Sequence, residues 1–291
     1  MRSLRSAWQV CLHNLIRLLT SSRFFVLLLS SFAVYAYVIL PLVDLGKEMN
    51  EPINALEPFI ALGNPRLLVF LYGAVIMLLF CDVPIMEDSH NSLIIRMSRR
   101  SWLGGQIFYI VLTSFLWVGM IFLFTVLVVA PRSFWANEWS YVINTLAYNR
   151  GLKIQIHIWA YVNANIVSNI TPWAAALHNY LLLSLYAVCI GLLVLLVNLR
   201  HTRALSVIVV LAVNIEGYMA MAFVDENHPL RIFLTWIAPF HHAWLDQHNF
   251  TNRWGFSPAA SYAFFLLLNT VLALIALARV KRIDLLPDTR R

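Results

Sequence analysis

Six stretches of this chain are each almost entirely apolar over about 20 residues, the length that an α-helix needs to cross the hydrocarbon core of a bilayer. They cover residues 24–42, 66–84, 106–129, 176–198, 204–224 and 258–279. Hydrophobic residues make up 60% of the chain and charged residues 12%, whereas soluble domains average about 45–50% and about 25%. The pattern predicts an all-α, polytopic membrane protein with one transmembrane domain over residues 1–291, and it excludes a soluble globular or disordered chain.

The basic residues predict how these six spans are oriented. An even number of spans puts both termini on one side, and 14 of the 21 lysines and arginines then lie on that side. Because loops rich in Lys and Arg stay in the cytoplasm, we expect both termini to be cytoplasmic and the protein to lie in the plasma membrane. The net charge of +7 is then used for orientation and for contacts with membrane lipids, not for binding nucleic acid.

Two further segments have membrane character but are not spans. Residues 2–22 place Leu4, Trp8 and Leu12 at helical spacing, which predicts an amphipathic helix in the cytoplasmic interface; a solvated N-terminal helix is the alternative. The apolar stretch 232–240 is too short to cross and contains Pro239. It predicts a short re-entrant segment before the last span.

The outer loops have their own patterns. Residues 139–148 have helical periodicity, and residues 153–159 alternate with period two. Seven of the ten tryptophans fall in outer segments, which favours loops that lie along the outer leaflet. The three cysteines have no CxxC neighbour, so neither a disulfide framework nor a zinc site is indicated.

The sequence lacks the motifs of an ATPase and of the common membrane hydrolases. There is no phosphate-binding loop, no H-E-x-x-H and no G-x-S-x-G. The cluster His241, His242, Asp246 and His248 has ligand chemistry, but its spacing would fit a metal only on a distorted turn. Polar residues that close a re-entrant turn are the simpler interpretation, so we expect no metal site.

Asp82 and Pro84 end the second predicted span, and one further acidic residue lies well inside a span. Glu216 falls in the fifth span, two residues from Asn214 and two from Tyr218. An ionisable group in a membrane span is costly and marks a functional site by default. The three residues form a candidate translocation path, and the alternative is a protonated or hydrogen-bonded structural glutamate.

The first cytoplasmic loop has a polarised charge pattern. Glu87 and Asp88 open it, and Arg96, Arg99 and Arg100 close it. Acids at the start and bases at the end of a helix match the helix dipole, so residues 87–100 predict a short interfacial helix that can dock on a soluble partner. An ordinary positively charged cytoplasmic loop is the alternative.

This layout resembles the type-2 ABC transporter permeases. Local sequence agrees along residues 94–106, in the aromatic-proline segment 236–240 and in the basic exit 279–284. The resemblance covers the whole chain, and the topology carries most of its weight. The loop between spans three and four, about 46 residues here, is longer than in many members of that family.

The resemblance implies a permease subunit of an exporter that moves an amphipathic substrate, such as a peptide or a lipid- or glycan-like molecule. ATP and Mg²⁺ would bind to a separate ABC ATP-binding subunit, which would contact Glu87, Asp88, Arg96, Arg99 and Arg100. A second permease chain would complete the path, and Trp236, Pro239, His241 and His242 would form the outer re-entrant element. Two alternatives stay open: an accessory or immunity-type membrane protein, and an intramembrane enzyme that uses Glu216 or the histidine cluster.

Overall fold

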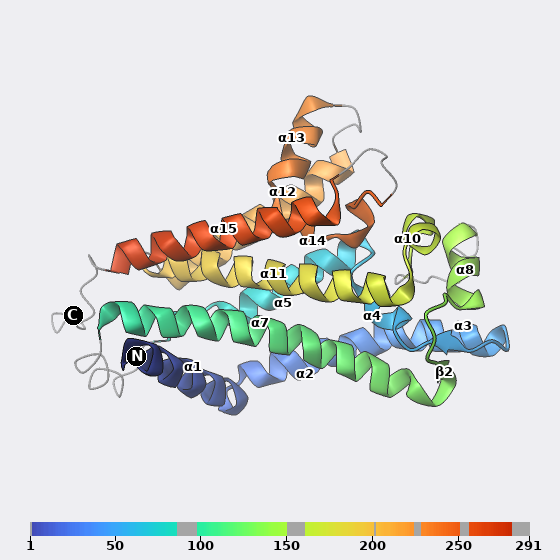
Figure 1. Cartoon of the computed structure of the whole chain (residues 1–291), viewed down its shortest axis with the longest axis horizontal. Helices are drawn as coiled ribbons and strands as arrows, with labels where there is room; N and C mark the ends of the chain where they lie inside the picture. The colour runs from blue at the N-terminus through green and yellow to red at the C-terminus, as the bar shows by residue number, and fades with distance from the viewer. Residues whose placement is uncertain are drawn as a thin grey trace.

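The computed structural model describes residues 2–85, 98–149, 161–200, 202–223, 228–250 and 256–280. These residues form an elongated bundle whose long helices run side by side (Figure 1). Helix α1 and the C-terminal end of α15 lie at the same end of the bundle, and the short elements β2, α8 and α10 gather at the other (Figure 1). We call these the terminal end and the loop end.

The described elements are almost all helical. The first half contains α1 (Arg2–Thr20), α2 (Arg23–Val34), the π-helical η1 (Tyr35–Ile39), α3 (Leu40–Glu48), β1 (Ile53–Asn54), α4 (Glu57–Leu62), α5 (Arg66–Phe80) and α7 (Arg99–Val129). The second half contains η2 (Ala130–Arg132), β2 (Ser133–Phe134), α8 (Tyr141–Tyr148), α10 (Ala164–Asn169), α11 (Pro172–Asn198), α12 (Arg203–Phe223), α13 (Pro229–Ile237), α14 (Pro239–Ala243), η3 (Leu245–Gln247) and α15 (Pro258–Arg279).

Five helical stretches are long and apolar enough to cross a membrane. They are Arg23–Glu48, Arg99–Arg132, Pro172–Asn198, Arg203–Ala220 and Pro258–Arg279. The segment expected to be the second span, 66–84, contains only the 15-residue apolar helix α5, which ends at Phe80. The all-α class expected from the sequence is therefore confirmed, together with five of the long apolar helices.

Two helix boundaries differ from the sequence-based prediction. The helix expected over 87–100 does not include Arg99 and Arg100, because a new helix, α7, begins at Arg99. Its start is fixed by Ser98, whose hydroxyl accepts a hydrogen bond from the Ser101 amide, as an N-cap residue does. The third apolar helix therefore starts seven residues before the expected position, and residues 86–97 lie outside the described part of the chain.

The N-terminal helix expected from the sequence is present as α1, and it packs alongside the first part of α7 (Figure 1). Its buried face contains Ala7, Val10 and Cys11. The apolar stripe of Leu4 and Trp8, continued by Leu12 and Leu19, stays exposed. The helix thus has two apolar faces, one against the bundle and one available to lipid.

Gly105 allows α1 to approach α7 closely. A Cβ atom at Gly105 would lie 2.6 Å from Val10 Cβ and 2.7 Å from the Ala7 carbonyl oxygen. Beside this contact, the buried Asn14 side chain donates a hydrogen bond to Gln106 Oε1 over 3.1 Å. Helix α1 therefore contributes a polar side chain, Asn14, to its packed face.

The loop end joins two segments that are distant in sequence. Strand β1 pairs in parallel with β2, so that Ile53 faces Ser133 and Asn54 faces Phe134. The side chain of Asn54 also donates to the carbonyl oxygens of Ala136 and Glu138, over 2.6 and 2.9 Å. Helix α8 confirms the helical pattern of 139–148, whereas residues 153–159 lie outside the described ranges.

The two adjacent glycines of α7 predict opposite mutational effects. We expect Gly105→Ala to lower the stability of the α1–α7 contact by about 1–3 kcal/mol, because the added methyl group overlaps α1. Gly104→Ala is the matched control: its methyl group would lie 3.8 Å from Ala7 Cβ, so the better helix propensity of alanine should be neutral or stabilising, by up to about 1 kcal/mol. Thermal unfolding in detergent and tryptic release of the N-terminal segment measure both effects. Equal behaviour of the two variants would contradict the close contact at Gly105.

Candidate functional site

Only two of the five residues expected to dock on a partner lie in the part of the chain that the structure describes. Glu87, Asp88 and Arg96 lie outside the described ranges. Arg99 and Arg100 are exposed in the first turn of α7, at the terminal end of the bundle. Cations are disfavoured by the dipole at a helix start, so these two side chains gain little from α7 itself.

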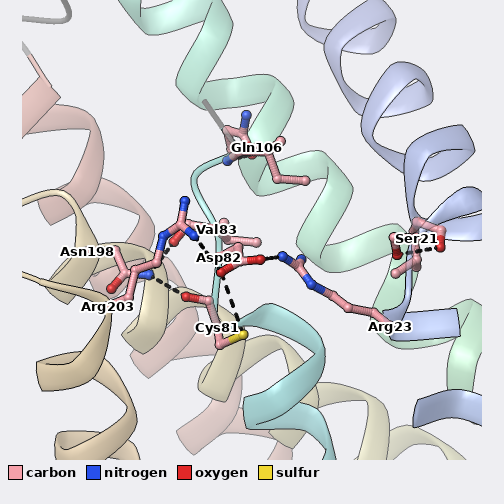
Figure 2. Close-up of polar contacts among 10 residues, drawn as sticks. Ser21, Arg23, Cys81, Asp82, Val83, Gln106, Asn198 and Arg203 are labelled. Atoms are coloured by element: carbon pink, nitrogen blue, oxygen red, sulfur yellow. Dashed lines mark hydrogen bonds and ion pairs between the residues drawn. The ribbon is translucent and has the colours of Figure 1, made fainter. Parts of the chain in front are cut away.

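An ion-pair centre at Asp82 lies at the same end. Asp82 follows α5, and its carboxylate is bound by Arg203 at the start of α12, over 2.9 Å, and by Arg23 at the start of α2. Figure 2 shows the carboxylate between the two arginines, which reach it from opposite sides. One carboxylate therefore ties together the ends of three helices.

The backbone after α5 is held by neutral side chains. Asn198, the last residue of α11, donates hydrogen bonds to the carbonyl oxygens of Cys81 and Val83, over 3.0 and 2.6 Å (Figure 2). The Ile85 amide approaches Gln106 Oε1 at 3.4 Å. The chain that leads into residues 86–97 is thus fastened to both α11 and α7.

The three residues of the expected translocation path do not share one face of α12. Asn214 is buried, Tyr218 is half-buried and Glu216 is exposed. Tyr218 lies under Arg66, whose guanidinium carbon is 4.7 Å from the ring centre, a cation–π distance. The structure brings Asn214 and Tyr218 toward α5 and leaves Glu216 on the outside of the single chain, beside the exposed Met219.

Asn214 is part of a polar contact inside the bundle. The Tyr186 hydroxyl of α11 donates a hydrogen bond to Asn214 Oδ1. Gly73 on α5 leaves room for this pair, since a Cβ atom there would lie 2.8 Å from the Tyr186 hydroxyl oxygen. Asn214 therefore links three helices and does not face an open path in this structure.

The expected outer element consists of two helices of very different exposure. Helix α13 has no buried residue, and its Trp236 side chain is 49% exposed. The helix is interrupted at Ala238, which has extended backbone angles. Every residue of the next helix, α14, is buried, including Pro239, His241 and His242. The exposed apolar helix α13 is thus followed directly by a buried one, and the re-entrant path stays a prediction.

Ser261 of α15 holds the buried histidines in place. Its hydroxyl oxygen lies 2.9 Å from His242 Nδ1 and 2.9 Å from His248 Nε2. The other ring nitrogens approach carbonyl oxygens, His242 Nε2 that of Trp236 at 3.0 Å and His248 Nδ1 that of Leu245 at 3.2 Å. The His242 ring is also stacked between Phe256 and Phe264.

Burial keeps these histidines neutral. It lowers the pKa of His248 to about 4. Burial also lowers the pKa of His241 to about 4, and the nearby basic groups His242, Arg231 and Arg66 act in the same direction. Neither ring nitrogen of His241 has a hydrogen-bond partner among the described residues. Asp246, the fourth residue of the sequence cluster, receives a hydrogen bond from Asn163.

The segment after α14 donates hydrogen bonds to backbone carbonyl groups at the break between α4 and α5. The Trp244 indole donates to the Asn64 carbonyl oxygen, and the Leu245 amide donates to the Gly63 carbonyl oxygen over 3.3 Å. Asn179 of α11 donates to the Phe59 carbonyl oxygen over 2.7 Å. Backbone groups that leave a helix inside a membrane bundle need such partners.

Glu57 connects two segments of the loop end beside this break. Its carboxylate accepts hydrogen bonds from the Asn54 amide, the Ser140 amide and the Ser140 hydroxyl, over 2.9, 2.7 and 2.8 Å. Burial nevertheless raises the pKa of Glu57 to about 7, against the effect of these donors. Glu57 is a structural anchor that the sequence patterns did not single out.

Within the described ranges, no group of three or more His, Cys, Asp or Glu side chains is placed to hold a metal ion. Cys11, Cys81 and Cys189 are free thiols, and the first and last of them are buried. The polar centres are therefore hydrogen-bonded and ion-paired joints between helices.

Sequence patterns missed the centres at Asp82 and at the α4–α5 break. The sequence predicts for Asp82 only that it ends a short span, yet an acid directly after an apolar segment of a chain rich in arginine is a signal for an ion pair. The partners of Gly63 and Asn64 lie about 180 residues away, and no local pattern points to them. No protein-family model, curated protein or solved structure matches the chain.

His241 and its neighbour His242 predict opposite effects of the same substitution. We expect His241→Phe to raise the unfolding temperature, because it removes two buried polar atoms without partners. His242→Phe should lower the unfolding temperature, with a loss of about 1–3 kcal/mol in the free energy of unfolding, because it breaks the hydrogen bonds to Ser261 and Trp236.

The gain from His241→Phe should grow on acidification. The folded pKa of about 4 lies below the ordinary 6.5, so the folded state binds fewer protons and loses stability as the pH falls from 6.5 toward 4. Glu57 has the opposite sign, since its raised pKa makes its contribution largest below pH 4.5 and lost through pH 7. Thermal unfolding of the wild type and of His241→Phe between pH 4.5 and 8 isolates the contribution of His241 as the difference in stability between the two proteins. A difference that shrinks on acidification would refute the lowered pKa of His241.

Proposed function

We propose that this chain is the membrane-spanning permease subunit of an ATP-driven exporter of the type-2 ABC class, with six crossings and both termini in the cytoplasm. The ATPase is a separate chain that binds ATP and Mg²⁺. Two permease chains, identical or paralogous, enclose the path. The cargo is amphipathic, in keeping with the apolar and aromatic outer surface of α13.

The junction around residues 86–97 is the observation that carries this proposal. On one side the chain is fastened at Ile85 to Gln106, and on the other side α7 starts at Arg99 under α1. Asp82, three residues before Ile85, binds the starts of α2 and α12. A partner that pushes on this loop would therefore displace four helices together, which is what coupling of ATP hydrolysis to rigid-body movement requires.

The pairing of β1 with β2 supports six crossings. These strands follow α3 and α7, so the ends of two long apolar helices lie together at the loop end. The chain between them has to return to the terminal end before α7 begins, and α5 is the helix available for that return. At 1.5 Å per residue α5 is about 22 Å long, and the buried helix α4 precedes it.

The exposure of Glu216 supports a second permease chain. Its side chain lies on the outside of α12, among exposed apolar residues such as Ile215 and Met219. A carboxylate that faces lipid is costly, and charged groups in membrane helices face a bundle interior or a water-filled cavity. A path enclosed by two copies would place Glu216 against water or a partner chain.

Labelling of single cysteines tests the number of crossings. In a cysteine-free background, Lys47→Cys and Arg132→Cys should react with an impermeant maleimide from the outside. Arg200→Cys should react only after the membrane is opened. If α5 does not cross, Lys47→Cys and Arg132→Cys will lie on opposite sides, and the six-crossing layout is wrong.

Charge reversal tests the coupling role. We expect the chain to co-purify from its own organism with an ABC ATP-binding subunit. The double variant R99E/R100E should lower the ATP hydrolysis of the complex at least about tenfold, the equivalent of about 1.4 kcal/mol. R132E, an exposed reversal at the opposite end, is the matched control and should leave hydrolysis unchanged.

Two results would remove the proposal. The first is a tagged chain that brings down no ATPase from its own organism, which would favour an accessory or immunity-type membrane protein. The second is equal activity of R99E/R100E and R132E complexes, which would show that the start of α7 takes no part in coupling.

A further inference from the structure

Two cavities follow one another along the seam between α2 and α5. The first, about 240 Å³, lies at the terminal end and is lined by polar groups that include Arg17, Ser21, Ser22, Arg23, Asp82 and Arg203. The second, about 530 Å³, is almost wholly apolar and lies farther along the same two helices. The ion pairs of Asp82 that line the first cavity also enter the coupling argument, but neither cavity belongs to the proposed translocation path.

Basic side chains predominate among the described charged residues that line the polar cavity. These residues comprise three arginines and one acidic residue, Asp82. Asp82 is shared between Arg23 and Arg203 (Figure 2), so one carboxylate serves two arginines, and Arg17 lines the same cavity. Planar guanidinium groups bind phosphate oxygens in a bidentate manner, which makes a phosphate monoanion or diester a suitable ligand.

The apolar groove is open to the outside of the bundle. Small side chains line the groove from both helices, among them Ala33 on α2 and Ala74 on α5. Leu67, Leu71 and Leu78 border the groove, and each of them is 39–48% exposed. In a bilayer such a groove is filled by lipid chains, since a void would forfeit van der Waals contacts.

The spacing of the two cavities fits one lipid molecule. Arg23 and Ser30 line the polar and the apolar cavity from the same helix, and seven residues of helix correspond to about 10 Å. Leu78, near the end of α5, lines the apolar groove, and Asp82, four residues later and just beyond that helix, lines the polar cavity. The headgroup layer of a bilayer is itself about 5–7 Å thick on each side.

We propose that the α2–α5 seam binds one anionic phospholipid of the cytoplasmic leaflet. The phosphate lies among Arg17, Arg23 and Arg203, and one acyl chain lies in the groove bordered by Leu67, Leu71 and Leu78. The two cavities together favour a lipid over a free phosphate, and basic pockets between membrane helices on this side bind anionic headgroups. The inference rests on the orientation of the termini and not on transport.

Lipid-dependent stability is the first test. The purified full-length chain in a mild detergent receives phosphatidylglycerol, phosphatidylcholine or inorganic phosphate, and thermal unfolding is followed. We expect phosphatidylglycerol to raise Tm by at least about 4 °C and the other two additions to raise it by less than half as much. Equal shifts with the two lipids would overturn the proposal, and a full shift with inorganic phosphate would show an anion site without a lipid.

Three variants locate the site by native mass spectrometry of retained phosphatidylglycerol. Arg203→Gln should reduce retention at least about fivefold, and Ala33→Leu should do the same by filling the groove without touching the ion pairs. Asp82→Asn should increase retention, because the competing carboxylate is gone. Arg200→Gln removes an exposed charge only three residues from Arg203 and outside the cavity lining, and it should retain lipid as wild type does.

The direction of the change in lipid retention for each variant distinguishes a defined binding site from general attraction to surface charge. A loss for Arg200→Gln as large as that for Arg203→Gln would attribute binding to net charge alone. Undiminished retention by folded Ala33→Leu would remove the acyl groove, and reduced retention by folded Asp82→Asn would remove the phosphate centre. Thermal unfolding of each variant identifies the folded ones, and either Ala33→Leu or Arg203→Gln suffices for the test.

Discussion

The backbone polar groups of a membrane chain need hydrogen-bond partners inside the apolar layer, and this constraint shapes the loop end of the bundle. The long helices satisfy it internally. The break between α4 and α5 does not, and its carbonyl groups are instead paired with Asn179, Trp244 and Leu245. The late segment from α13 to η3 is therefore needed to complete an early part of the fold.

The terminal end is organised by charge instead. Asp82 binds Arg23 and Arg203, and the neighbouring turn is fixed by Asn198 and Gln106. Between the two ends, the described core is apolar apart from small joints such as Tyr186 with Asn214. A bundle that is tightly specified at both ends and weakly polar in the middle is suited to tilting as a unit, which agrees with the proposed role as a transporter subunit.

Periodicity and composition predicted most of the fold because both are local properties. The all-α class, five long apolar helices, the N-terminal helix and the helix at 141–148 follow from spacing of apolar residues within short windows. The boundary at Ser98 was missed because a one-residue N-cap outweighed a charge pattern spread over 14 residues. The polar joints could not be predicted in detail, since Asn54, Glu57 and Asn179 find partners about 80 to 120 residues away. The docking residues before Ser98 stay a prediction.

The hydroxyl group of Ser261 limits which ring nitrogens of His242 and His248 can carry a hydrogen. Carbonyl oxygens only accept, so His242 Nε2 and His248 Nδ1 must each carry a hydrogen to bond Trp236 and Leu245. Both remaining ring nitrogens then face one serine that owns a single proton. Neutral rings cannot make all four bonds, whereas one added proton would complete them, although burial opposes that charge. While both rings are neutral, the Ser261 hydroxyl can therefore donate to only one of them, and α14, η3 and α15 meet at this shared hydroxyl.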